Sequence, residues 1–172
     1  PRIVWEDDSE PNVTIGNPCP VVDRRTETVW IGFTSNNQRA FVTRSTDDGR
    51  TWATPTEITE AVKPKDWRRY WIGPGHGLQL TRGPKAGRLI FPSYHIVDEG
   101  DRRVMRSHMV CSDDHGQTWS EAIILSGDGV SGDLGYPSTV QLDDGSLVTA
   151  WYENMAGSPN AVLRQAQWTL KS

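Results

Sequence analysis

The sequence STDDGRTW at residues 45–52 returns with small changes as SDDHGQTW at residues 112–119. Serine and aspartate side chains can hydrogen-bond to the backbone of a tight turn, glycine accepts positive φ, and tryptophan supplies a large ring for burial. We therefore expect each octapeptide to form a structural turn between two strands. The residues of the pattern are Ser45, Asp47, Gly49, Thr51 and Trp52 in the first copy and Ser112, Asp114, Gly116, Thr118 and Trp119 in the second.

A metal-binding loop is the alternative interpretation of these acidic turns. A calcium loop of the EF-hand type needs more oxygen ligands, at a different spacing, than either octapeptide carries. We therefore expect no metal site, and no other motif in the chain indicates a cofactor.

The segments around the two turns predict an all-β fold. Short runs rich in Val, Ile, Thr, Trp and Tyr alternate with Gly, Asp, Asn and Pro, as in TVWIGFT (28–34), RAFVTRS (39–45) and RSHMVCS (106–112). Four-stranded units are expected at residues 12–60 and 72–127. A third unit is expected at residues 133–172, but it lacks its fourth strand. Residues 1–8 offer a closing outer strand. Repeated four-stranded units that bury their faces against one another are typical of propeller blades.

Composition limits the partners. With 172 residues, 35% hydrophobic and 23% charged, the chain fits one globular domain, and it has no apolar run long enough to span a membrane. A net charge of −4 argues against nucleic acid as the main partner. The first ten residues show no signal-peptide pattern, so localisation stays open, and a processed N-terminus would be compatible with a secreted or periplasmic protein. Cys19 and Cys111 are expected to be buried free thiols.

Several segments resemble exo-α-sialidases in order and spacing. They are NPCPVVD (17–23), GPGHGLQL (73–80), RLIFPSY (88–94) and GYPSTVQLDDGSLVTAWYE (135–153), together with the two octapeptides, which are called Asp-boxes or BNR repeats in that family. The resemblance implies a six-bladed propeller, of which this chain would contain the second, third and last blades. It also implies sialylated glycans or related sugars as partners. A homodimer with a two-fold axis would restore six blades.

The resemblance assigns two catalytic positions. Tyr136 matches the family's nucleophile, and Glu153 matches an acidic residue that orients an active-site arginine. Taken alone, Tyr136 is an aromatic residue at the start of a strand, and Glu153 is a solvent-facing strand end.

Two further residues are expected to bind substrate. Tyr94 matches a tyrosine that lines the sugar pocket, and His76 lies between glycines that would let a ligand approach the backbone. The alternatives are a half-buried strand tyrosine and a hydrogen-bonded loop histidine. Arg68 and Arg69 are expected in a solvated loop, and His115 is expected to be exposed.

The family's three carboxylate-binding arginines, its acid/base aspartate and the glutamate that deprotonates the tyrosine have no matching position in this chain. The predicted function is therefore that of a sialidase-like glycoside hydrolase, or a fragment of one, which cleaves terminal α-linked sialic acids with retention. The alternative is a non-catalytic glycan-binding or structural propeller module.

Overall fold

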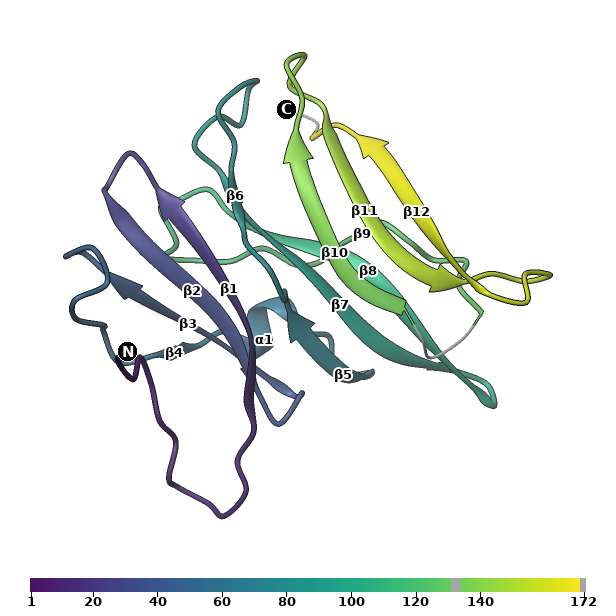
Figure 1. Ribbon diagram of the computed structural model, residues 1–172, viewed down its shortest axis with the longest axis horizontal. Coiled ribbons are helices and arrows are strands. Elements are labelled where there is room, and N and C mark those ends of the chain that lie inside the picture. The colour runs from purple at the N-terminus through teal and green to yellow at the C-terminus, as the bar shows by residue number, and fades with distance from the viewer. Residues whose placement is uncertain (131–133, 171–172) are drawn as a thin grey trace.

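A computed structural model describes residues 1–130 and 134–170 and contains three antiparallel sheets (Figure 1). The first sheet, in the order β1-β2-β3-β4, consists of β1 (Ile15–Asp23), β2 (Thr28–Ser35), β3 (Arg39–Ser45) and β4 (Thr56–Glu57). The second, in the order β5-β7-β8-β9 with β6 also beside β7, consists of β5 (Trp67–Ile72), β6 (Leu78–Gln79), β7 (Leu89–Glu99), β8 (Arg102–Ser112) and β9 (Ile123–Ile124). The third, in the order β10-β11-β12, consists of β10 (Leu134–Gln141), β11 (Leu147–Asn154) and β12 (Ala161–Trp168). The expected all-β fold is confirmed.

The sheets follow one another across the molecule as propeller blades, and β1, β5 with β6, and β10 are the innermost strands (Figure 1). One helical turn, α1 (Thr59–Val62), follows β4. No helix of the described residues is long and apolar enough to cross a membrane.

The hydrophobic core lies in two layers, one on each face of the second sheet. Strands β7 and β8 are buried along most of their length for this reason. The layer toward the first sheet includes Val21, Trp30, Tyr70, Phe91 and Trp119. The layer toward the third sheet includes Trp71, Tyr94, Met109, Leu147 and Trp151. Cys19 and Cys111 are buried free thiols, as expected.

The innermost strand of the second sheet is split, which the sequence interpretation missed. The expected solvated loop around Arg68 and Arg69 is wrong, because these residues belong to β5, which pairs with β7. Burial of Trp67, Tyr70 and Trp71 draws this segment into the sheet, while the two arginines stay exposed.

The N-terminal segment differs from the expected closing strand of the third sheet. Residues 1–8 contain no strand. Ile3, Val4 and Trp5 instead line an apolar groove against Phe33 of β2. The segment therefore lies beside the first sheet, at the opposite end of the molecule from β12 (Figure 1).

The two Asp-box turns share one set of hydrogen bonds. In the first, the Ser45 hydroxyl donates to Asp47 at 2.8 Å and accepts from the Gly49 N–H at 2.9 Å, and Asp47 accepts from the Thr51 N–H at 2.8 Å and hydroxyl at 2.6 Å. The bonds from Thr51, followed by the bond from Ser45, lower the pKa of Asp47 to about 2. The turn is therefore held by a carboxylate that is ionised at neutral pH.

The second turn repeats these contacts. The Ser112 hydroxyl donates to Asp114 at 2.8 Å and accepts from the Gly116 N–H at 2.8 Å, and Asp114 accepts from the Thr118 N–H at 2.9 Å and hydroxyl at 2.5 Å. Burial alone would raise the pKa of Asp114, but the bonds from Thr118 and Ser112 outweigh it and hold the pKa below its usual value. Both octapeptides thus form the same self-contained turn.

The tips of the two turns have different surroundings. A Cβ atom on Gly116 would approach Cε2 of Trp30 to 2.3 Å, so the second turn packs directly on the first sheet. A Cβ atom on Gly49 would meet only the turn's own Trp52, at 3.6 Å. The second Asp-box is therefore an inter-blade contact as well as a turn.

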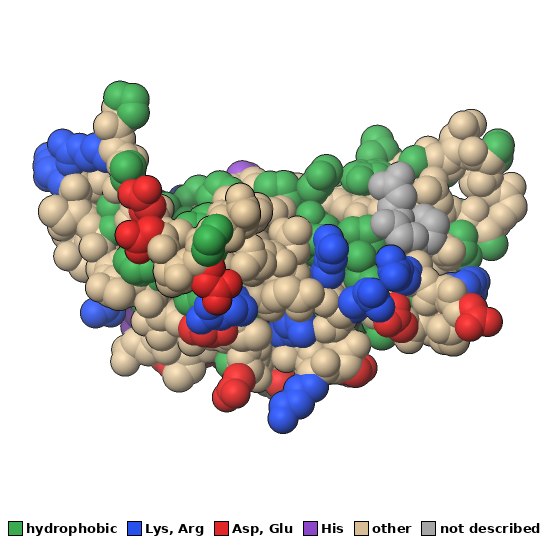
Figure 2. Space-filling view, turned by 90° about the horizontal axis from the view of Figure 1, so that it is seen from below, with side chains coloured by type: hydrophobic (Ala, Val, Ile, Leu, Met, Phe, Trp, Pro, Cys, Tyr) green, Lys and Arg blue, Asp and Glu red, His purple; other side chains and the backbone are tan. Residues whose placement is uncertain are grey.

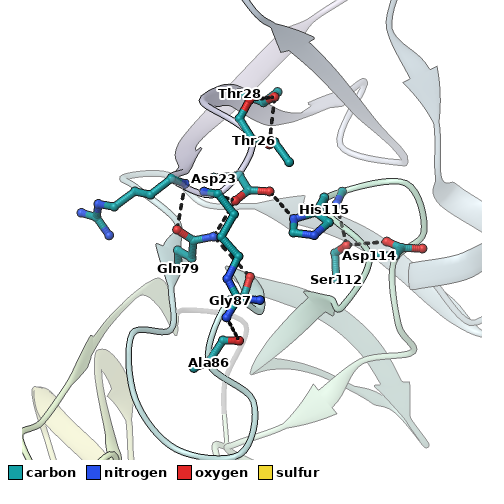
Figure 3. A network of polar contacts seen from close by, with 12 residues as sticks. Asp23, Thr26, Thr28, Gln79, Ala86, Gly87, Ser112, Asp114 and His115 are labelled. Carbon is teal, nitrogen blue, oxygen red and sulfur yellow. Dashed lines mark hydrogen bonds and ion pairs between the residues drawn. The ribbon is translucent and has the colours of Figure 1, made fainter.

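His115, at the tip of the second turn, also connects this turn to the first sheet, through the buried carboxylate of Asp23 (Figure 3). Its Nδ1 lies 2.7 Å from Asp23 of β1, whose side chain is fully buried. The Asp23 carboxylate also accepts from the Gln79 side chain at 2.7 Å and the Arg25 N–H at 2.9 Å. His115 was expected to be exposed, and 39% of its side chain is accessible, but its contact with the buried Asp23 was not expected.

Two glutamines at the ends of inner strands, Gln79 of β6 and Gln141 of β10, each link their sheet to the preceding sheet. Gln79 accepts from the Arg24 N–H at 2.9 Å, which joins the second sheet to the first. Gln141 accepts from the Thr81 N–H at 2.8 Å and donates to the Arg82 carbonyl at 3.1 Å, which joins the third sheet to the second. These bonds satisfy backbone groups just beyond the preceding inner strand.

A histidine pair is buried between the first and second sheets. His95 and His108 place their Nδ1 atoms 3.0 Å apart, so one ring donates and the other accepts. Burial lowers the pKa of His95 to about 3 and that of His108 well below its usual value. Both rings are therefore neutral near pH 7.

Alanine substitution of the two turn glycines should separate the turn from the inter-blade contact. Both glycines have positive φ, 78° for Gly49 and 85° for Gly116, so each alanine carries a strain of about 1–2 kcal/mol. Gly116→Ala must also displace Trp30, which adds about 1–3 kcal/mol. Urea unfolding should show a clearly larger loss for Gly116→Ala than for Gly49→Ala, and equal losses would contradict the packing of this turn on Trp30.

Acid should destabilise the fold through the histidine pair. Unfolded histidine has a pKa of about 6.5, above the folded values, so the unfolded state binds more protons as the pH falls below that point. This stability is fully present above about pH 6.5 and decreases by up to about 1.4 kcal/mol per pH unit for each histidine. Urea titrations at several pH values between 7.5 and 4.5 should show a shallower pH slope in His95→Gln or His108→Gln, while the exposed control His76→Gln keeps the original slope. A wild-type slope in both core variants would refute this origin.

Candidate active site

The three inner strands share an unusual backbone feature at the same end of the molecule. Asn17, Gly73 and Tyr136 have φ values of 58°, 73° and 55°, and each precedes a proline. In β1 and β10 the residue sits in an irregularity of the strand register. Gly73 lies against Asn17, since a Cβ on Gly73 would be 3.2 Å from the Asn17 carbonyl oxygen. This end of the inner strands is the candidate site.

Tyrosine side chains gather at this end. Tyr136 is 56% exposed, and its ring lies 5.9 Å from that of Tyr94 and 5.8 Å from that of Tyr152. Tyr94 is buried and stacks on Trp71 at 4.7 Å. We call Trp71, Tyr94, Tyr136 and Tyr152 the aromatic cluster. The structure thus brings together the two predicted residues Tyr136 and Tyr94.

Hydrogen bonds hold the buried side of the aromatic cluster. The Asn17 amide donates to the Tyr94 hydroxyl at 3.3 Å. Burial raises the pKa of Tyr94 to about 12, so its hydroxyl stays protonated at neutral pH. Of the two tyrosines, Tyr94 is the buried one and Tyr136 is the accessible one.

The hairpin between β2 and β3 positions Trp71, and the sequence interpretation missed it. Asn36 and Asn37 both have positive φ, 53° and 55°, as in the tight turns that suit β-hairpins. The Asn37 side chain accepts from the Trp71 indole at 2.8 Å, and its carbonyl accepts from the Tyr70 N–H at 3.1 Å. The consecutive asparagines between two strands were the available signal.

Glu153 lies in a separate charged cluster next to the aromatic one. Its side chain is fully buried, forms an ion pair with Arg164 of the adjacent strand, and accepts from the Ser126 hydroxyl at 3.1 Å. Asp128 contacts the same guanidinium nitrogen of Arg164 at 2.7 Å. The carboxylate is thus not a solvent-facing strand end, and the guanidinium beside it is shared by two acids.

His76 lies away from the aromatic cluster. Its Nδ1 is 3.1 Å from the Gly77 carbonyl, and it lines a groove with Pro20, Val22 and Arg24, at the boundary of the first and second sheets. The described residues that line this groove include none of the aromatic cluster. The structure therefore does not group His76 with Tyr94 and Tyr136.

Within residues 1–130 and 134–170, no three His, Cys, Asp or Glu side chains are arranged to hold a metal ion. Figure 2 views the molecule from the candidate-site end. Hydrophobic side chains follow its concave upper edge, and basic side chains gather below them in the middle of the view (Figure 2). Acidic side chains lie among these basic ones in the same view (Figure 2).

Comparison with known proteins identifies the family of the chain. Residues 1–151 match the family model described as BNR repeat-like domain. Human Sialidase-4 is 34% identical over 128 residues, which cover 60% of this chain and 26% of that protein. A sialidase from Micromonospora viridifaciens is 30% identical over 150 residues, which cover 77% of this chain and 22% of that protein.

A solved structure shows the same fold. Hadza microbial sialidase Hz136 superposes with a TM-score of 0.73 at 24% identity, over 92% of this chain and 33% of that one. The chain thus spans about a quarter of the length of the two curated relatives. From the family match and these relatives, the chain belongs to the BNR repeat-like family and is a sialidase-family protein.

Proposed function

We propose that the aromatic cluster is the nucleophile-bearing part of an exo-sialidase site and that Tyr136 attacks the anomeric carbon of a terminal α-linked sialic acid. The observation that carries this proposal is the position of Tyr136, exposed at the start of an inner strand and packed against Tyr94. Human Sialidase-4 and the bacterial sialidase make a sialylated glycan the substrate class of choice.

The chemistry of sialic acid favours a phenol at this position. The anomeric carbon carries a carboxylate, and a carboxylate nucleophile would approach it with like charge. A neutral phenol avoids this repulsion, and sialidases with a tyrosine nucleophile are the known exception to the two-carboxylate rule. Attack forms a bond between the Tyr136 oxygen and the anomeric carbon as the glycosidic bond breaks. Water then attacks the anomeric carbon from the face that the leaving group vacated and displaces the Tyr136 oxygen, so that two inversions give net retention.

The backbone of Tyr136 supports a functional role. A bulky residue at a φ of 55° is a steric outlier, and strain of this kind persists only where the surroundings impose it. Functional sites are where such residues concentrate. Here the strained backbone turns the ring out of the sheet toward Tyr94 and Tyr152.

The remaining parts of the reaction have no matched residue in this chain. A phenol is a weak nucleophile at neutral pH until a base removes its proton, and a poor leaving group needs an acid. We therefore propose the nucleophile and pocket wall for this chain, and no complete set of catalytic residues. A two-fold homodimer of six blades also stays a prediction.

Glycine and alanine at position 136 should test the strain. Both variants remove the ring, but only glycine accepts positive φ without a steric cost. We expect Tyr136→Gly to be about 1 kcal/mol more stable than Tyr136→Ala in urea unfolding, against the usual order in strands. A more stable alanine variant would show that position 136 lacks the left-handed conformation.

A sialoside with an activated leaving group should test the nucleophile. The 4-methylumbelliferone group of a 4-methylumbelliferyl α-sialoside leaves without help from an acid, so the rate of its release depends on the nucleophile. Release should fall to below about 1% of the wild-type rate in Tyr136→Phe and stay unchanged in the control Asp48→Asn, at the exposed tip of the first Asp-box. The product should form first as the α anomer, which proton NMR detects.

Unchanged release in Tyr136→Phe would refute this nucleophile. Absence of wild-type release, with sialyllactose binding that persists in Tyr136→Phe, would replace the hydrolase with the glycan-binding alternative. Absence of both release and binding would overturn the proposal in either form.

A further inference from the structure

The tip of the β2–β3 hairpin lies beside β5 of the second sheet and bonds to it at three points (Figure 1). The Gln38 side chain donates to the Arg68 carbonyl at 2.8 Å. The Asn37 carbonyl accepts from the Tyr70 N–H at 3.1 Å, and the Asn37 side-chain oxygen accepts from the Trp71 indole at 2.8 Å. Two of these bonds hold the backbone of β5, whereas the third holds a ring of the aromatic cluster.

The bond to the Trp71 indole is not needed merely to bury a tryptophan in this fold. The indole nitrogens of three other buried tryptophans have no hydrogen-bond partner among the residues that the structure describes; these are Trp30, Trp119 and Trp151. The protein therefore tolerates the free-energy cost of a buried indole N–H without a partner. At Trp71 the bond adds a fixed direction for the ring, which burial alone does not supply.

Two ring contacts lead from Trp71 to the exposed phenol of Tyr136. Trp71 stacks on Tyr94 with the ring centroids 4.7 Å apart and the ring planes 14° apart. Tyr94 in turn meets Tyr136 edge to face, with the centroids 5.9 Å apart and the planes at 90°. Side chains in a close-packed interior have little room to move independently. A displacement of the Trp71 ring is therefore passed through Tyr94 to Tyr136.

We propose that Asn37 is a positioning residue of the site, which fixes Trp71 and, through Trp71 and Tyr94, holds the Tyr136 ring in the orientation for attack on the sugar. This inference rests on the proposed function. A catalytic group has to lie within about 0.5 Å of its productive position, and a misplacement of about 1 Å can cost about a hundredfold in rate. The first sheet therefore contributes to the reaction through its β2–β3 hairpin.

Asn36, the neighbour of Asn37 in the turn, offers a matched control. Both asparagines have positive φ, 53° and 55°, and each accepts a hydrogen bond through its side chain. The Asn36 side chain accepts from the Thr14 N–H at 2.9 Å and so holds the hairpin to the segment before β1. Glycine at either position accepts the left-handed backbone and removes the side-chain acceptor. Only at position 37 is that acceptor the partner of a ring in the aromatic cluster.

Kinetics with the 4-methylumbelliferyl α-sialoside, together with NMR spectra of the full chain, should test this role in Asn37→Gly, Asn36→Gly and Asn37→Asp. We expect Asn37→Gly to lower kcat at least about tenfold and to change KM less, because the orientation of the nucleophile acts on the bond-forming step. The indole signal of Trp71 and the ring signals of Tyr136 should shift in the same variant. Asn36→Gly should match the wild type in both measurements, and Asn37→Asp, which keeps an acceptor oxygen, should retain most of kcat.

Failure of this inference can be distinguished from failure of the proposed function. If the wild type releases the product and Asn37→Gly has the same kcat as Asn36→Gly, the bond from Asn37 serves the fold alone and the inference fails. Unchanged ring signals of Tyr136 in Asn37→Gly would also overturn it. If the wild type releases no product, the proposed function fails, and the role of Asn37 in the reaction fails with it.

Discussion

Burial of the second sheet on both faces is the constraint on which the rest of the structure depends. Strands β7 and β8 are buried on both faces along most of their length, so both faces of the second sheet need a cover. The first and third sheets each cover one face, and no single sheet of the three could exist in this form alone.

The two ends of the inner strands are held by different chemistry. At one end, side chains bond to the neighbouring blade, as Gln79 and Gln141 do to backbone groups and His115 does to Asp23. At the other end, left-handed residues before prolines bend the strands, and aromatic rings fill the junction. The first end is held by hydrogen bonds between blades, and the second carries the exposed phenol of Tyr136. Because of this difference, the second end is the one at which a reactive side chain is accessible to a ligand.

Much of the fold could be predicted from the sequence, because its signals are local. The Asp-box hydrogen bonds join residues at most four positions apart, and β-rich segments between turn residues identify most strands. The split inner strand could not be predicted, since only burial of Trp67, Tyr70 and Trp71 draws β5 into the sheet. The contact of His115 with Asp23 could not be predicted either, because Asp23 lies 92 positions earlier in the chain. In the site, Tyr136 and Tyr94 came from family resemblance, whereas the shared guanidinium of Arg164 depends on strand register that spacing alone does not give.

The Asp-box separates two tasks that most turns combine. Its serine, aspartate and threonine close the loop among themselves, so the residue between aspartate and glycine takes no part in closing it. That residue is Asp48 in one copy, pointing to solvent, and His115 in the other, facing a carboxylate of the adjacent blade. A duplicated blade could therefore acquire a new neighbour through one substitution at the tip, without refolding its own hairpin. The same turn can therefore be used in different blades, and the side chain at its tip determines which neighbouring residue it contacts.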